Sequence, residues 1–369
     1  MRHLKWITAL ELDRWAETNE ARPLLPELLR RLVHATVEKG DLQHISLPGG
    51  DEVHRPGYDG ITITKIGNEK VPAGTAYWEM GTNADVKRKL DEDFEKRIQK
   101  RGEGDFSQVT YIAVTPRDYQ NKEAWTAEKQ KLNQWKDVRV YDSDDLEQWF
   151  ETGLGAALWA ARYVSANRPE GLQDLSAHWE NIQKSLKQKL PPAALLVSRQ
   201  QATEAFKRWL DGSPDILAVH GQSPQETVDV FTAWVVSLAQ DEQDAIASRA
   251  LVVDQVEAWR AIIDSKQRLV LICSERLDLT PELLAEAWRK GHHVLRPISS
   301  IRAQTGNVVR LERMNRGDLE KVLREAGIGE QEAFSLAQQC GGSFAVLKRR
   351  LSAVPIEKVP AWANPPASE

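Results

Sequence analysis

The chain has 369 residues, of which 41% are hydrophobic and 28% charged, and its formal net charge is −5. The length favours two domains, and the composition is typical of a globular protein. The negative net charge excludes a protein that binds nucleic acid through an overall basic surface. Two distant cysteines, Cys273 and Cys340, exclude a disulfide or zinc framework. The sequence has no apolar run of about 18 residues that would cross a membrane, and residues 1–15 lack a signal-peptide core. We therefore expect a cytoplasmic protein without a membrane span.

Helix and strand patterns alternate clearly in the first part of the chain. Leucines recur at helical spacing over residues 24–38, and residues 60–66 and 75–80 read as two strands separated by a turn. Ser143 is the expected N-cap of the helix that follows the last strand. The predicted order is a helix (24–38), three strands (44–47, 60–66 and 75–80), a helix (84–100), a strand (109–115), a helix (121–135) and a strand (138–142).

The second part of the chain predicts another α/β domain. Helical stretches separate the first four of five short apolar strands, an alternation that is typical of a parallel sheet. These strands are expected at 215–221, 249–254, 268–273, 292–297 and 307–312. The predicted divisions are an N-terminal domain (1–163), a linker helix (164–193), the second α/β domain (194–312), a helical lid with breaks at GIG and CGG (313–355), and a loose Pro-rich tail (356–369).

Two carboxylates of the first domain suggest a metal site. Asp59 opens the strand at 60–66, and Glu79 lies in the neighbouring strand. Hard divalent cations prefer oxygen ligands, and hydrolysis of a phosphodiester commonly uses such an ion. Successive side chains of a strand point to opposite faces, so Glu79 faces a cleft if Trp78 is in the core. The alternative is an ordinary turn at Asp59 and a solvated glutamate on an edge strand.

The element order, together with the string RPGYDGITI…VPAGTAYWEMGT…KLDEDFEKR, resembles the PD-(D/E)XK nuclease superfamily. More narrowly, it resembles the nuclease-like domains that are fused to NTPase modules in bacterial anti-phage defence proteins. The resemblance covers about residues 10–163. It implies a restriction-endonuclease fold, Mg²⁺ (or Mn²⁺) as cofactor and double-stranded DNA as substrate. It also implies that Asp59 and Glu79 are the two acidic residues of the motif.

The motif lysine is missing, because position 81 is glycine. The resemblance implies that a lysine of the following helix takes over this catalytic role, with Lys87 and Lys89 as candidates and Lys89 in the better matching position. The alternative is that both lysines lie on a solvated helix face beside acidic partners. Glu27, on the first helix, is a candidate for an additional metal contact.

The second domain begins with the shape of a phosphate loop, a strand (215–221) followed by a turn and a helix. When the sequence is aligned on Gly221, Glu226, Thr227 and Val228 stand where a working loop has Gly, Lys and Ser/Thr. The domain resembles a degenerate AAA/STAND-type NTPase module. We therefore expect that it does not bind ATP tightly, since a glutamate there repels phosphate.

The leading hypothesis is a metal-dependent DNA endonuclease in bacterial anti-phage defence, joined to a regulatory NTPase-like module that does not use ATP. One alternative is a non-catalytic module that binds nucleic acid or a partner protein, and Gly81 favours it. Another is a sensor whose second domain forms a homo-oligomer and brings the nuclease domains together.

Overall fold

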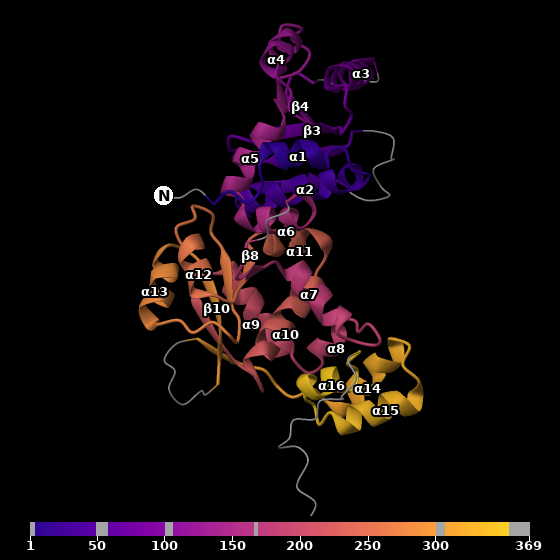
Figure 1. Cartoon of the computed structure of the whole chain (residues 1–369), viewed down its shortest axis with the longest axis vertical. Helices are drawn as coiled ribbons and strands as arrows, with labels where there is room; N and C mark the ends of the chain where they lie inside the picture. The colour runs from indigo at the N-terminus through magenta and orange to yellow at the C-terminus, as the bar shows by residue number, and fades with distance from the viewer. Residues whose placement is uncertain (1–3, 49–57, 100–105, 166–168, 300–306, 354–369) are drawn as a thin grey trace, which may run out of the picture. The chain divides into compact units, whose positions relative to one another are not determined.

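The computed structural model of the protein describes residues 4–48, 58–99, 106–165, 169–299 and 307–353 (Figure 1). The fold is mixed α/β, with one sheet of five strands and one of six. The tail predicted at 356–369 lies outside the described residues. The chain divides into two compact units, the first comprising Met1–Leu175, Pro214–Ile216 and Leu238–Leu295, and the second comprising Ser176–Ser213, Leu217–Ser237 and Arg296–Glu369.

The five-stranded sheet contains all the strands predicted in the first part of the chain. Its strands follow the chain order, with antiparallel pairing from the first to the third strand and parallel pairing from the third to the fifth. The strands are β1 (Leu42–Ser46), β2 (Gly60–Thr64), β3 (Gly74–Met80), β4 (Val109–Val114) and β5 (Asp137–Tyr141).

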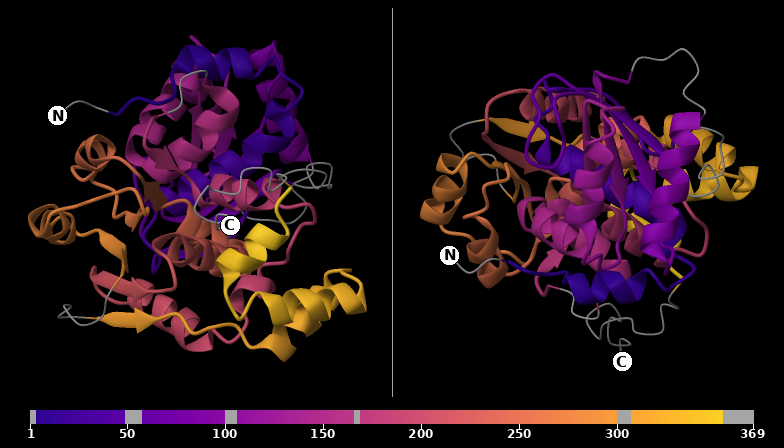
Figure 2. Two further views of the ribbon diagram at one scale, coloured as in Figure 1. Left: turned by 60° about the horizontal axis from the view of Figure 1, so that its bottom comes forward. Right: turned by 90° about the horizontal axis from the view of Figure 1, so that it is seen from above.

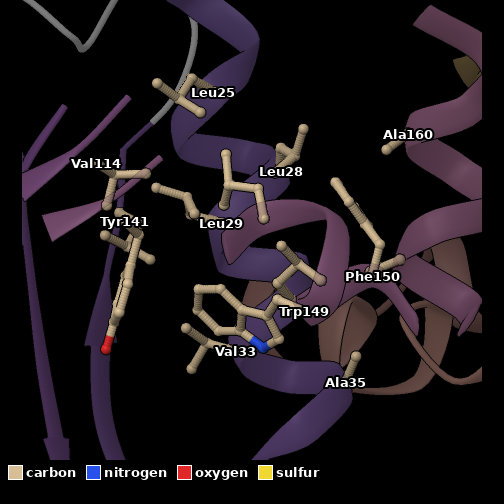
Figure 3. Packing of buried hydrophobic residues seen from close by; sticks show 14 of the residues in the cluster. Leu25, Leu28, Leu29, Val33, Ala35, Val114, Tyr141, Trp149, Phe150 and Ala160 are labelled. Atoms are coloured by element: carbon tan, nitrogen blue, oxygen red, sulfur yellow. The ribbon is translucent and has the colours of Figure 1, made fainter. Parts of the chain in front are cut away.

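Helices cover both faces of this sheet (Figure 1). One face packs against α1 (Ala9–Trp15), α2 (Ala21–Thr36), α5 (Ser143–Thr152) and α6 (Leu154–Val164). The other face packs against α3 (Val86–Gln99) and α4 (Lys122–Gln130). The leucines of the stripe predicted for α2 are buried, namely Leu25, Leu28, Leu29 and Leu32. Figure 3 shows Leu28 and Leu29 near Trp149, and Leu25 near Val114. Trp78 belongs to the same cluster and is 0% exposed.

Two helix starts differ from the sequence-based expectation. The N-cap of α5 is Asp142 rather than Ser143, because the Asp142 carboxylate accepts hydrogen bonds from the Asp144 and Asp145 amides at 3.1 and 3.2 Å. Helix α1 was not predicted. It begins with a reciprocal capping box between Thr8 and Glu11, a pattern that is visible in the sequence.

The six-stranded sheet has the order β11-β7-β10-β9-β8-β6. Its strands are β6 (Leu172–Gln173), β7 (Ile216–His220), β8 (Ala250–Val253), β9 (Val270–Cys273), β10 (His293–Ile298) and β11 (Val308–Arg310). The expectation of an all-parallel sheet is wrong at one edge, since β6 pairs with β8 in the antiparallel direction. Strand β6 lies in the segment predicted as a linker and is too short to give an alternating pattern. It covers the edge of β8, which would otherwise offer unpaired backbone groups.

Three helices follow the second sheet in the chain, α14 to α16. They form a compact group, seen in yellow in Figures 1 and 2. The predicted breaks at GIG and CGG do separate these three helices. Among the helices that the structure describes, none has the length and apolar character needed to cross a membrane. The remaining helices are α7 (Leu175–Lys184), α8 (Ala193–Leu196), α9 (Gln200–Asp211), α10 (Pro224–Val236), α11 (Gln240–Ala247), α12 (Val256–Ile262), α13 (Pro281–Arg289), α14 (Arg316–Glu325), α15 (Glu330–Gln339) and α16 (Phe344–Arg350).

Within the first unit, residues 238–295 are tied closely to α2 and α6. A Cβ atom added to Gly155 would lie 2.2 Å from the Ser248 carbonyl oxygen, so only glycine permits this approach of backbone to backbone. Arg30 of α2 donates a 2.6 Å hydrogen bond to Asp244, whose side chain is 0% exposed. Arg249 donates to the His34 carbonyl oxygen at 3.0 Å. These contacts satisfy backbone and charged groups that would otherwise be buried without partners.

Candidate active site

Asp59 and Glu79 lie next to each other on the five-stranded sheet. In the β2–β3 pair Gly60 is opposite Trp78, which puts Asp59 beside Glu79. The Met80 amide donates a 2.8 Å hydrogen bond to Asp59 Oδ2 and holds that carboxylate against β3. The predicted alternation is confirmed: Trp78 is in the core, and Glu79, which is 3% exposed, points to the opposite face, toward α3.

A small pocket opens on the Glu79 face of the sheet, where the carboxyl ends of β3 and β4 meet the first turns of α3. Its polar lining consists of Glu79, Asn83, Lys89, Asp93 and Thr115. The carboxyl ends of neighbouring parallel strands are a common location for ligand sites in α/β proteins. The pocket therefore joins one of the two predicted carboxylates to one of the two candidate lysines.

Lys89, and not Lys87, reaches the gap left by Gly81. A Cβ atom added to Gly81 would lie 3.1 Å from Lys89 Cγ and 3.4 Å from Lys89 Cε, so the Lys89 stem packs over the glycine. The Lys89 ammonium donates a 2.8 Å hydrogen bond to Asp93 at the pocket. The Lys87 side chain is 64% exposed and pairs with Asp91, one turn further along the helix. The alternative given for both lysines was a solvated helix face beside an acidic partner, and Lys87 has this arrangement.

Arg97 is a major residue of the site that the sequence did not indicate. Its guanidinium donates to both carboxylate oxygens of Glu79, through Nε to Oε1 and through Nη2 to Oε2, the latter at 3.1 Å. It also lies 4.8 Å from the ring centroid of Tyr58. Lys89, Asp93 and Arg97 follow one another at intervals of four residues on α3, so they form one stripe of that helix. This spacing was the available signal.

The electrostatics of the pair Asp59 and Glu79 follow from burial. Burial raises the pKa of Glu79 to about 7, and Asp59 contributes in the same direction while Arg97 opposes both. Burial also raises the pKa of Asp59, against the hydrogen bond from Met80. Clustered carboxylates with raised pKa values are typical of sites that bind a cation or exchange a proton near neutral pH.

Glu27 is not brought to this pocket. It lies on α2, which packs on the Trp78 face of the sheet, and its carboxylate accepts hydrogen bonds from Arg31 at 3.1 and 2.9 Å. Among the described residues, no three or more His, Cys, Asp or Glu side chains are arranged to hold a metal ion. The donor chemistry of Asp59 and Glu79 nevertheless suits a hard divalent cation, and Arg97 shows that Glu79 binds a cationic group with both oxygens.

No protein-family model matches the chain, and no curated protein matches it significantly. The interpretation of this site therefore depends on its own residues and geometry.

Proposed function

We propose that residues 1–163 act as a metal-dependent endonuclease domain on double-stranded DNA in anti-phage defence. The main support is that Glu79 and Lys89 meet at one pocket with Asp59 directly beside Glu79, and that Lys89 packs over Gly81. In this proposal, Lys89 of α3 takes the role of the missing motif lysine. The NTPase-like second domain would regulate this activity without using ATP.

In this proposal, Asp59 and Glu79 would hold Mg²⁺ or Mn²⁺. When bound, such an ion polarises the phosphate and lowers the pKa of the attacking water. Lys89 adds a positive charge beside the phosphate, and Asp93 keeps the ammonium directed at the pocket. Arg97 neutralises Glu79 in the structure, so the ion has to compete with a guanidinium for the Glu79 oxygens.

The test is nicking of supercoiled plasmid by the full chain with Mg²⁺ or Mn²⁺. Asp59→Asn and Glu79→Gln keep the shape of each side chain and remove its charge, so each should lower the nicking rate by about 100-fold or more. Lys87→Ala is the matched control on the exposed face of α3 and should cleave like wild type. Equal cleavage by wild type and both carboxamide variants would remove the assignment of the site.

A second prediction concerns the position of the lysine. Lys89→Ala should lower the nicking rate by about 100-fold, because it removes the ammonium that packs over Gly81. Adding Gly81→Lys to Lys89→Ala should recover much of the loss, since the shortened side chain at 89 leaves room for the new lysine. The nicking rates of the three proteins measure this. A Lys89→Ala variant that cleaves like wild type contradicts the proposed role.

The second candidate function is binding of nucleic acid or a partner protein without cleavage. The pairing of Glu79 with Arg97 favours it, because a carboxylate with both oxygens bound to a guanidinium is already satisfied without a metal. Duplex DNA that binds equally well with and without a chelator, and is not nicked under any metal condition, would support this candidate over the endonuclease.

A further inference from the structure

The connection between β7 and α10 is the segment that resembles a phosphate loop. Strand β7 ends at His220 and α10 begins at Pro224, so residues 221–223 form the turn. The hydroxyl of Ser223 caps the helix by accepting the Glu226 amide at 3.2 Å, and Pro224 has no N–H to offer. The Glu226 amide is therefore already bound by Ser223, and Pro224 has no amide hydrogen, so neither can donate to a nucleotide phosphate.

Glu226 turns back into this turn instead of pointing to solvent. It is 3% exposed, and its Oε2 accepts a 2.8 Å hydrogen bond from the Gln222 amide. A Cβ atom added to Gly221 would lie 3.0 Å from the same oxygen, so the carboxylate lies directly against the turn at its glycine. A carboxylate with two acceptor oxygens thus lies against the turn between β7 and α10, the turn that resembles a phosphate loop.

Arg199 supplies the matching cation. Its side chain is 0% exposed, and its Nη2 donates to Glu226 Oε1. Two backbone carbonyl oxygens fix its position from elsewhere, Leu195 accepting from Nη1 at 2.9 Å and Glu312 accepting from Nε at 3.2 Å. The guanidinium is therefore held toward the turn by groups other than Glu226. A buried arginine in such a position requires an anion beside it.

We propose that Glu226 is a built-in anion that replaces a nucleotide phosphate in this loop, and that Arg199 is the cation that binds it. Carboxylate and phosphate both accept hydrogen bonds from a guanidinium and from backbone N–H groups. Because the carboxylate belongs to the chain, its effective concentration at the site exceeds that of a free anion. The strand–turn–helix unit stays ordered without nucleotide, and this inference is independent of the proposed nuclease activity.

Chemical rescue tests the proposal. Glu226→Ala removes the carboxylate and leaves the Arg199 guanidinium without its anion. Acetate or inorganic phosphate should then bind there. The melting temperature of this variant should rise by about 3 °C or more over roughly 0–100 mM of either anion, relative to chloride at equal ionic strength. Wild type and the matched control Glu204→Ala, an exposed glutamate of α9, should show no such excess.

The role of Arg199 is tested in the same assay. Adding Arg199→Met to Glu226→Ala should abolish the response to acetate and phosphate. If Glu226→Ala does not fold in chloride buffer, the same anions should increase its yield of folded protein on refolding. The proposal is overturned if Glu226→Ala responds no more than wild type in both assays, if the double variant still responds, or if ATP or phosphate stabilises wild type beyond the chloride control.

Discussion

Replacing Arg97 by methionine is expected to destabilise the folded protein by about 3–5 kcal/mol at alkaline pH. The substitution keeps most of the apolar stem and removes the guanidinium that binds both oxygens of Glu79. Glu79 is 3% exposed, so its negative charge would stay buried without a counterion. Urea denaturation of the wild type and of Arg97→Met, compared at matched pH, measures the difference in free energy of unfolding.

The size of this effect should depend on pH in a defined direction. Burial raises the pKa of Glu79 from 4.5 to about 7 in the wild type, and the loss of Arg97 raises it further. A carboxyl group with a higher pKa in the folded state binds its proton more tightly there. The stability that this bound proton contributes is fully present below the pKa of Glu79 in the unfolded chain. It is lost as the pH rises through the pKa of Glu79 in the folded protein. The deficit of Arg97→Met should therefore be small near pH 4.5 and grow as pH rises past about 7.

The double variant Glu79→Gln with Arg97→Met is the control for this prediction. It removes both charges, so it should be more stable than Arg97→Met alone at alkaline pH. Relative to the wild type, the free energy of unfolding of the double variant should rise with pH, because only the wild type loses stability as Glu79 ionises. That of Arg97→Met should fall with pH. A deficit of Arg97→Met that is equal at all pH values would show that Arg97 does not change the pKa of Glu79, and it would contradict this prediction.

Trp78→Ala is expected to cost about 3–5 kcal/mol of stability, the usual range for deleting a fully buried aromatic side chain. Trp78 is 0% exposed and stacks on Trp149 with a centroid separation of 6.3 Å. Its Nε1 donates a 3.0 Å hydrogen bond to Thr62 on β2. Trp78 therefore helps to hold β3 in register with β2. This register determines the face of the sheet to which Glu79 points.

Trp288→Ala is the matched control for this core prediction, because the Trp288 side chain is among the exposed large hydrophobics at 48%. Its loss should change the free energy of unfolding by less than about 1 kcal/mol, even though its Nε1 donates to the Pro214 carbonyl oxygen. Urea denaturation of both variants gives the comparison. Equal losses in the two variants would show that the Trp78 cluster is not the dominant core of this sheet.

The sequence could predict the strands of the first sheet and the facing of Glu79, because side chains alternate strictly along a strand. It could not predict Arg97 as the partner of Glu79. A spacing of four residues shows which side chains share a helix face, but not which strand residue that face meets. Lys89 was identified as the better matching candidate, and in the structure its packing over Gly81 and its place in the pocket lining separate it from the exposed Lys87.

Glu226 shows a different limit of sequence-based prediction. The pattern Ser-x-x-Glu at Ser223 and Glu226 is typical of a helix start, with the glutamate turned back toward the preceding turn. The comparison with a phosphate loop instead suggested a charge that repels a ligand. The direction of the Glu226 side chain depends on Arg199, which the Leu195 and Glu312 carbonyl oxygens hold in place, and these three residues are far from Glu226 in the sequence. A site assembled from such separate parts of the chain leaves no pattern in the local sequence.

The backbone approach at Gly155 has a practical consequence for anyone who expresses residues 1–163 alone. A fragment that ends at residue 163 would lose Ser248 and Asp244, and with them the cover over α6 and the counterion of Arg30. It would also expose Leu154 and Leu158, which pack into the cluster around Trp259. Poor solubility or rapid proteolysis of that fragment would then reflect a severed core, and its inactivity would say nothing about Asp59 and Glu79.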